Sequence, residues 1–229
     1  MRLRRVVFLR LGMLTRAHPA SVLWCEGTDV LTFLNVLSTN LVNGSCTTVV
    51  LTPNAKIIDV VDVICLPNGV ALVGSAGNRS HLVKHLSDKM LGREVSVRDV
   101  SDLNQVLLCD AEPLAEPGIT VHKSFFGWMR VAPLDQSLEP NWKDDDWNDH
   151  RVNLMIPYHG HEITDRHHPL ACGLGALVHE HKGCYTGQEL MARMRSRGRQ
   201  GHRLVRLEGQ PNEATTCGRT HSLAIVRDA

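Results

Sequence analysis

The chain has 229 residues, of which 43% are hydrophobic and 21% charged, and its formal net charge is +1. This composition is typical of a globular protein with one large domain or two small ones. No apolar run approaches the roughly 18 residues that a membrane-spanning helix needs, and the small net charge excludes global electrostatic capture of nucleic acid or membranes.

Strand and helix patterns alternate along the chain. Apolar residues at spacings of three and four predict a helix after Thr28 and another after Asn78, and either residue is a good N-cap. Two further helices are predicted at 170–181 and from Gly187 to about Arg197. The predicted strands are 21–26, 46–52, 56–66, 69–74, 94–100, 105–110, 119–122 and 125–131. Strands joined both by hairpins and by helices favour an α+β fold over a doubly wound parallel sheet.

The N-terminal segment is rich in arginine. Residues 1–25 contain five arginines and no acidic residue, which is compatible with a mitochondrial transit peptide, although serine is scarce. We therefore expect residues 1–19 to form an N-terminal extension, either disordered or targeting. The expected location is cytoplasmic, with the mitochondrial matrix as the alternative.

Cysteine and histidine spacings give little sign of a metal site. The seven cysteines are scattered, with no Cys-x-x-Cys pair, which predicts reduced thiols rather than a disulfide framework or a structural zinc site. Pairs such as His159 and His161 would share one face of a strand, as metal ligands do. The spacing fixes no third ligand, so polar surface beside a cleft is the preferred interpretation and no metal is expected.

The segment KGCYTGQE, residues 182–189 and hereafter the signature segment, has the pattern of a helix start. Thr186 and Glu189 stand at the spacing of a capping box, directly before the helix-favouring run LMARMR. A helix is therefore predicted to begin at Gly187, with free backbone N–H groups facing the preceding turn.

Cys184 lies just outside this predicted helix end, two residues after Lys182. Both features favour the thiolate, so Cys184 is expected to be more reactive than an ordinary thiol. Gly183 and Gly187 permit tight turns and close ligand approach. The alternative is a capped helix that happens to follow a cysteine.

The signature segment resembles the signature of the YgfZ family, which is related to the glycine-cleavage T-protein. The family pattern is Lys-Gly-Cys-aromatic-x-Gly-Gln-Glu, and every fixed position is matched. Similar stretches occur in the expected order, so the resemblance covers roughly residues 20–200. These stretches are 27–42, 51–63, 73–86, 151–163 and the positions Pro169, Gly173 and Leu174.

Two departures from the T-protein pattern argue against glycine-cleavage chemistry. T-proteins carry two adjacent acids in a first-lobe strand, whereas here Asp59 is followed by Val60. The T-protein Gly-Tyr-Thr-Gly-Glu segment has no match in 120–150. Fuller-length relatives also carry a C-terminal β-barrel, for which only residues 200–229 remain here.

The resemblance implies a T-protein-like folate-binding fold with two α+β lobes around a cleft. The first lobe would span 20–112 and the second 113–199, with the signature segment lining the cleft. Residues 200–229 would form a truncated remnant of the C-terminal β-barrel.

The resemblance also implies tetrahydrofolate or a derivative as cofactor. Asp59 would accept hydrogen bonds from the pterin, with Asp62 as the alternative, and Cys184 would be the functional thiol; Asp59 and Cys184 are the candidate catalytic residues. The anionic glutamate tail of a folate needs cationic partners, and the candidates are Arg151, Lys182 and Arg193. The expected folate-binding residues are Arg151, Lys182, Gly183, Tyr185, Gly187, Gln188, Glu189 and Arg193.

The function implied is that of an accessory protein, more than an enzyme, that supports iron–sulfur cluster assembly or repair and through it tRNA modification. Its partners would be folate and iron–sulfur assembly or client proteins, with no membrane and no direct nucleic-acid contact. One alternative is a folate-dependent aminomethyl or one-carbon transferase, for which only Asp59 could act at the folate nitrogen. Another is an RNA-contacting accessory protein that uses the arginines of 193–206.

Overall fold

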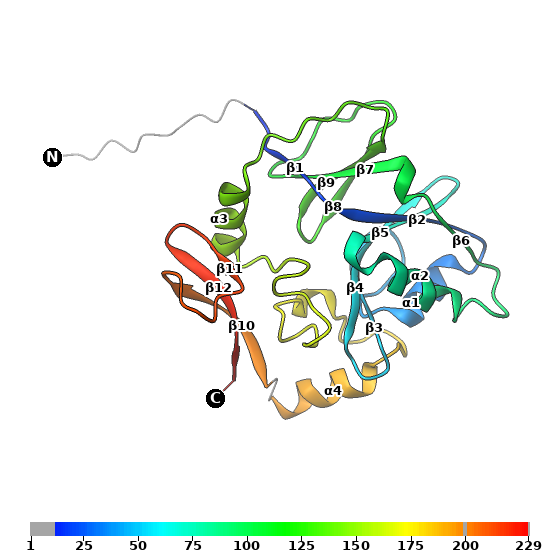
Figure 1. Ribbon diagram of the computed structural model, residues 1–229. Helices are drawn as coiled ribbons and strands as arrows, with labels where there is room; N and C mark the ends of the chain where they lie inside the picture. Colours follow the sequence, from blue (N-terminus) through cyan, green and yellow to red (C-terminus); the bar gives the residue numbers. More distant parts are fainter. Residues whose placement is uncertain (1–11, 199–200, 229) are drawn as a thin grey trace.

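The computed structural model describes residues 12–198 and 201–228. These residues form three antiparallel sheets with helices packed around them, which confirms the α+β class (Figure 1). None of the described helices has the length and apolar character needed to cross a membrane.

The first sheet has the strand order β3-β4-β5-β2-β6. Its strands lie where the sequence predicts them, because each combines β-branched residues with flanking turn residues. Helices α1, Val30–Leu37, and α2, Arg79–Ser87, cover one face. The strands are β2 Ala20–Glu26, β3 Cys46–Leu51, β4 Ile57–Leu66, β5 Gly69–Ser75 and β6 Ser96–Asp99.

The second sheet has the order β1-β7-β9-β8 and packs on the other face of the first. Its strands are β1 Thr15–Ala17, β7 Asn104–Cys109, β8 Thr120–Ser124 and β9 Gly127–Pro133. The expected first lobe, residues 20–112, includes β7. In the structure β7 pairs with β1 and β9 of the second sheet and not with the first sheet. Strand β1 likewise lies inside the predicted extension 1–19, of which residues 1–11 lie outside the described residues.

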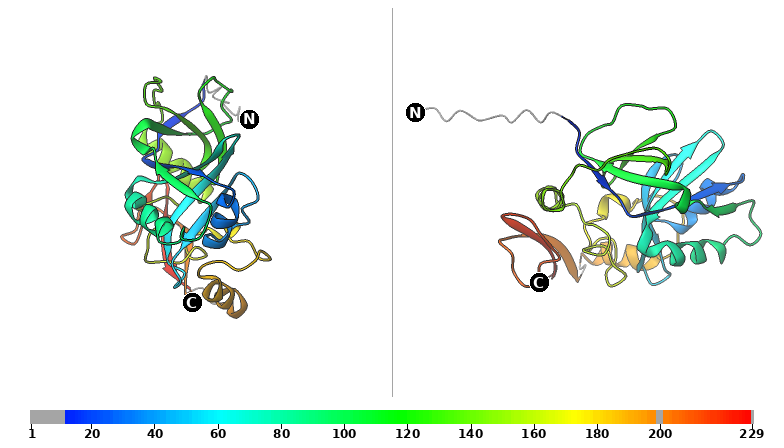
Figure 2. Two further views of the ribbon diagram at one scale, coloured as in Figure 1. Left: turned by 90° about the vertical axis from the view of Figure 1, so that its right-hand side faces the viewer. Right: turned by 45° about the horizontal axis from the view of Figure 1, so that its top comes forward.

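The C-terminal residues form a third sheet of order β10-β12-β11. Its strands are β10 His202–Glu208, β11 Thr216–Cys217 and β12 His221–Arg227. The segment that follows helix α3, Asp144–Leu154, runs between the third sheet and the first (Figures 1 and 2). Helix α4, Gln188–Arg197, lies beyond this segment at the lower edge of the molecule in Figure 1.

One helix was not predicted, and one predicted helix is absent. Helix α3 was not predicted, although Asp144, Asp145 and Asp146 occupy its first turn, where carboxylates interact favourably with the helix dipole. The helix predicted at 170–181 is instead a series of turns with one short 3₁₀ helix, Gly175–Leu177. The remaining 3₁₀ helices are Ala76–Asn78, labelled η1, and Ser101–Leu103, labelled η2.

Strand β4 is buried on both faces. Val60 and Ile64 pack toward the second sheet, whereas Val61 and Val63 pack toward α1 and α2. This is the continuous apolar pattern of a strand covered on both sides. A polar side chain in β4 is therefore buried and must find its hydrogen-bond partners inside the protein.

Asp62 of β4 is the centre of a buried polar cluster that joins the first two sheets. Its carboxylate accepts hydrogen bonds from Thr47 Oγ1 on β3 at 2.5 Å and from Ser124 Oγ on β8 at 2.8 Å. His122 Nε2, also on β8, lies 3.2 Å from the same carboxylate. Thr47 in turn accepts the backbone N–H of Phe125 at 2.9 Å. The cluster therefore fixes β8 and the turn after it on the first sheet.

A buried ion pair holds the third sheet. Arg151 of α3 and Glu162 are fully buried, and Nη1 of the arginine lies 3.1 Å from Oε2 of the carboxylate. Arg151 Nη2 donates to Thr216 of β11 at 2.9 Å. Glu162 also accepts hydrogen bonds from Thr216 at 2.6 Å and Thr215 at 2.5 Å. The pair thus connects α3, the segment after it and the third sheet.

Replacing Arg151 with leucine should destabilise the protein by about 3–5 kcal/mol, because Glu162 would be left as a buried and unpaired charge. Urea unfolding monitored by circular dichroism measures the change. Arg193→Leu is the matched control, since it removes an exposed ion pair with Glu189 and should cost no more than about 0.5 kcal/mol. Equal losses from the two substitutions would contradict this assignment.

Candidate functional site

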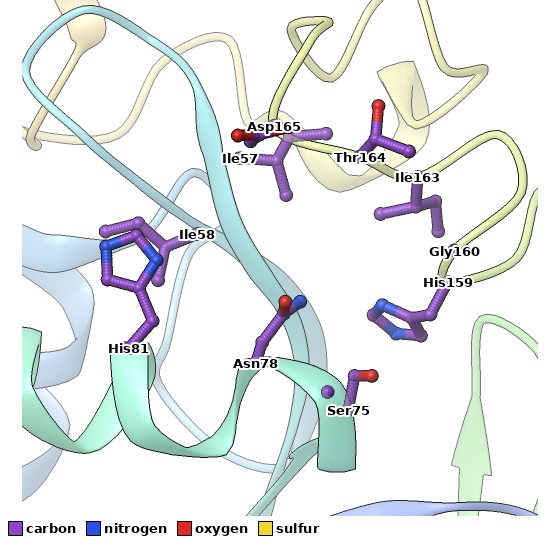
Figure 3. Close-up of a pocket in the computed structure, with 11 residues that line it drawn as sticks. Ile57, Ile58, Ser75, Asn78, His81, His159, Gly160, Ile163, Thr164 and Asp165 are labelled. Atoms are coloured by element: carbon purple, nitrogen blue, oxygen red, sulfur yellow. The ribbon is translucent and has the colours of Figure 1, made fainter.

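A pocket of about 450 Å³ lies between the first sheet and the segment after α3 (Figure 3). One wall comes from β4, the end of β5, η1 and α2, and the other comes from the loop 159–165. Its lining is Ile57, Ile58, Ser75, Gly77, Asn78, His81, His159, Gly160, Ile163, Thr164 and Asp165. The pocket therefore combines an apolar floor of isoleucines with a small number of polar groups, as ligand sites commonly do.

Asp59 lies directly behind this lining and is fully buried. One carboxylate oxygen accepts Asn78 Nδ2 and the backbone N–H of Val60, both at 3.0 Å, and the other accepts the N–H of Ser75 at 2.9 Å. Burial nevertheless dominates and raises the pKa of Asp59 to about 7, against the opposing effect of these hydrogen bonds. Asp59 is thus a buried acid that changes protonation near neutral pH.

Asn78 was predicted to cap α2 and serves a different purpose. It occupies the N-cap position, but its side chain makes no capping hydrogen bond. Its amide donates to Asp59 instead and forms part of the pocket wall. The sequence pattern correctly placed Asn78 at the N-cap position, which asparagine suits. The pattern did not reveal that the side chain donates to Asp59.

His159 lines the other side of the pocket, and its side chain is only 8% exposed. Its ring packs among His18, Phe126 and Tyr158, with ring centroids 5.3–6.3 Å apart. Burial, with a smaller contribution from the neighbouring His18, lowers the pKa of His159 to about 3, so the imidazole is neutral at physiological pH. Its Nδ1 lies 3.5 Å from an Asp59 oxygen, and neither ring nitrogen has a hydrogen-bond partner among the described residues.

His159 and His161 do not share one face of a strand, the arrangement that a metal site would have needed. The side chain of His159 is buried in the pocket wall, whereas His161 is exposed and its Nδ1 lies 3.1 Å from the Thr215 carbonyl oxygen. The two residues belong to a loop, in which the two-residue alternation of a strand does not apply.

Lys182 holds the signature segment against the C-terminal end of α1. Its ammonium group donates to the carbonyl oxygens of Asn35 at 2.6 Å, Ser38 at 2.7 Å and Asn40 at 2.5 Å, around the C-terminal end of α1. Carbonyl groups at a helix end carry partial negative charge that suits a cation. Burial lowers the pKa of Lys182 to about 8. All three ammonium donors are used within the protein, so Lys182 has no unpartnered donor for the anionic ligand tail that it was expected to hold.

The capping-box prediction for α4 is wrong, although the helix itself is present. The N-cap is Gly187, with a φ of 84°, and no side chain caps the helix. Thr186 is instead fixed through its backbone N–H, which donates to the Val36 carbonyl oxygen at 3.0 Å. A Cβ atom at Gly187 would lie 2.9 Å from the Thr52 carbonyl oxygen, so glycine permits a close approach to the β3–β4 turn.

Cys184 is exposed at the surface, as is Cys217 of β11. The anchoring of Lys182 holds the exposed segment that contains Cys184 and Gly183 against α1. Tyr185 and Gln188 line a separate pocket of about 420 Å³ beside α4. No residue of the signature segment, all of which is described, lines the pocket in front of Asp59.

The other predicted cations are also placed away from the Asp59 pocket. Arg151 is fully buried by its ion pair with Glu162, and Arg193 is exposed and paired with Glu189. The lining residues of the pocket, all within the described ranges, include neither lysine nor arginine. Of the residues predicted for the folate site, the structure therefore places Asp59 at this pocket and the others elsewhere.

Comparison with known proteins relates the fold to one class. The structure of the glycine cleavage system aminomethyltransferase T from Bartonella henselae matches 94% of this chain and 78% of that chain, with a TM-score of 0.76 and 15% sequence identity. The chain therefore has the aminomethyltransferase T fold, as predicted.

Sequence comparison gives a more local match. An aminomethyltransferase from Symbiobacterium thermophilum is 41% identical over 49 residues, which are 21% of this chain and 13% of that protein. No protein-family model matches the chain. The likeness to aminomethyltransferases is thus one of fold and of a short sequence segment, and the resemblance to the YgfZ signature stays a prediction.

Asp59→Asn should change how stability depends on pH. In the folded protein Asp59 keeps its proton up to about pH 7, whereas its ordinary pKa is 3.8. The folded state therefore binds more protons between these values, and the stability that the protonated carboxyl contributes is lost as pH rises through about 7. Between pH 4 and 8 the free energy of unfolding of the wild-type protein should fall by on the order of 4 kcal/mol relative to that of Asp59→Asn. Urea unfolding of both proteins across this range measures it, and parallel pH curves would rule it out.

Limited alkylation should label Cys184 and Cys217 ahead of the other cysteines, because these two are exposed. Burial raises the pKa of Cys25 and Cys172 to about 12 and that of Cys109 to about 11, so these thiols should react last. Mass spectrometry after limiting iodoacetamide ranks the sites. Early labelling at a buried cysteine, or labelling of Cys184 only after denaturation, would contradict the placement of the signature segment.

Proposed function

We propose that the protein binds a reduced folate in the pocket in front of Asp59 and acts as an accessory protein in iron–sulfur cluster assembly or repair. The observation that carries the proposal is the buried Asp59, held by Asn78 and Ser75 behind a pocket of about 450 Å³ in an aminomethyltransferase T fold. The resemblance of the signature segment to the YgfZ family supplies the link to iron–sulfur chemistry.

The composition of the pocket suits the pterin ring better than the tail of a folate. Ile57, Ile58 and Ile163 offer apolar surface to a flat ring, and Asn78 and His159 provide polar groups at its edges. The described lining offers no cation to a carboxylate. In this proposal the ring enters the pocket and the anionic glutamate tail extends toward solvent.

The transferase alternative is supported by the fold likeness and by Asp59. A general base must reach the reacting nitrogen directly or through one water. Asp59 is fully buried and both of its oxygens already accept hydrogen bonds, so it is better suited to orienting the lining residues Asn78 and His159 than to removing a proton from a ligand. The preferred function is therefore folate binding without aminomethyl transfer.

Cys184 provides the proposed contact with iron–sulfur proteins. It is exposed in a segment fixed on α1 by Lys182, so its thiol is available to a partner's cluster or thiol. The RNA alternative is weakened because several arginines of 193–206 have protein partners. Arg193 pairs with Glu189, and Arg195 donates to the Val178 carbonyl oxygen at 2.8 Å. The expected location remains the cytoplasm or the mitochondrial matrix.

Calorimetric titration with tetrahydrofolate tests the proposal. Thr164→Trp, which would fill the pocket from its half-buried rim, should weaken binding at least about 10-fold, equivalent to about 1.4 kcal/mol. Gln188→Trp, which alters the separate pocket beside α4, is the matched control and should leave affinity unchanged. Absence of folate binding by the wild-type protein would refute the proposal.

An aminomethyl-lipoyl transfer assay on the same protein separates the two folate hypotheses. Folate binding without turnover is the expected result. Turnover that Asp59→Asn abolishes would instead assign the transferase function.

A further inference from the structure

Among the residues that line the pocket, His159 is the one with buried side-chain nitrogens that have no hydrogen-bond partner within the described residues. Both ring nitrogens are buried without a hydrogen-bond partner, and the ring lines the pocket (Figure 3). A neutral imidazole has one donor and one acceptor, and burying either without a partner lowers the stability of the folded state. Such an arrangement is retained at a cost, which points to a role in binding.

Asp59 determines which nitrogen is available to a ligand. Its Oδ1 lies 3.5 Å from His159 Nδ1, which is longer than a hydrogen bond but can shorten when a ligand orders the site. Oδ1 already accepts two N–H groups and therefore acts as an acceptor toward His159 as well, which favours a proton on Nδ1. The tautomer with Nδ1–H leaves Nε2 as an acceptor. The Asn78 amide and the backbone N–H groups of Ser75 and Val60 hold the carboxylate in place.

We propose that His159, oriented by Asp59, is a specificity-determining residue of the pocket and accepts a hydrogen bond through Nε2 from an N–H group of a bound planar heterocycle. This inference rests on the proposed function, under which the heterocycle is the pterin ring and the donor is its amino or amide N–H. A ligand without such a donor would leave Nε2 buried and unpaired, so the pocket discriminates against it.

The surroundings of His159 argue against a purely structural role. Its ring lies among Phe126, Tyr158 and His18, an aromatic environment that offers the two ring nitrogens no hydrogen-bond partner. His18 Nδ1 is satisfied by the Tyr158 hydroxyl at 2.5 Å, whereas His159 has no comparable partner in the described chain. Replacing His159 with phenylalanine should therefore preserve or raise the melting temperature while it reduces ligand affinity.

Binding is measured by calorimetry with two probes, tetrahydropterin and an analogue in which the ring amide and amino N–H groups are methylated. The wild-type protein should bind tetrahydropterin about 10-fold more tightly than His159→Phe does, as expected for one hydrogen bond to a buried group. The methylated analogue should bind both proteins equally weakly, because it lacks the donor. His159→Gln, whose amide oxygen reaches the Nε2 position, should recover part of the affinity.

His161→Phe is the matched control, since His161 is an exposed histidine of the same loop and should leave affinity unchanged. Equal affinity of wild type and His159→Phe for tetrahydropterin would overturn the inference and leave folate binding intact. No binding of tetrahydropterin or tetrahydrofolate by wild type would overturn both. A lower melting temperature in His159→Phe, with no recovery of affinity in His159→Gln, would show that His159 has a structural role only. If His159→Phe does not fold, the affinity of His159→Gln for tetrahydropterin decides between the two roles.

Discussion

The buried carboxylate of Asp62 is the constraint on which the arrangement of the first two sheets depends. It is nearly inaccessible in the middle of a strand covered on both faces, where an unpaired charge would be prohibitive. Its partners Thr47 and Ser124 come from different sheets, so its hydrogen bonds are satisfied only when those sheets are packed in one register. An apolar interface of the same area would tolerate sliding more readily, whereas this polar cluster does not.

The position of the second sheet in turn shapes the pocket. The turn after β8 is held by the hydrogen bond from Phe125 to Thr47, and this places Phe126 against Tyr158 and His159. The wall that carries His159 is therefore supported by contacts that begin at Asp62. The other wall belongs to the first sheet and contains Asp59, three residues earlier in the same strand. One strand thus supplies Asp62, which joins the two sheets, and Asp59, which holds the pocket-lining residues Asn78 and Ser75 from behind.

Local patterns in the sequence were sufficient to locate most strands and the α+β class, and the resemblance to the T-protein pointed to Asp59. They did not reveal the sheet to which a strand belongs, because β7 has the same apolar pattern as the strands of the first sheet and only its partners differ. They also did not reveal the partners of two charged side chains. Lys182 and Arg151 have the chemistry of anion binders, yet Lys182 is held by backbone carbonyls and Arg151 by a buried glutamate. Helix α3 was not predicted because its acidic first turn has the composition of a polar loop. The same carboxylates are favourable at a helix N-terminus, where they interact with the helix dipole.

Gly74 and Asp59 constrain which residues can occupy each other's positions. The backbone of Gly74 lies so close to Asp59 that a Cβ atom there would sit 2.3 Å from a carboxylate oxygen and 3.2 Å from the hydroxyl of Ser21. Neither neighbour can withdraw easily, since Asp59 is held by three hydrogen bonds and both residues are fully buried. Positions 59 and 74 are therefore coupled, and a lineage that retains the acid must also retain the glycine. A homologue with a larger residue at 74 should have a smaller or differently placed side chain at 59, so the presence of this site could be recognised from the two positions together.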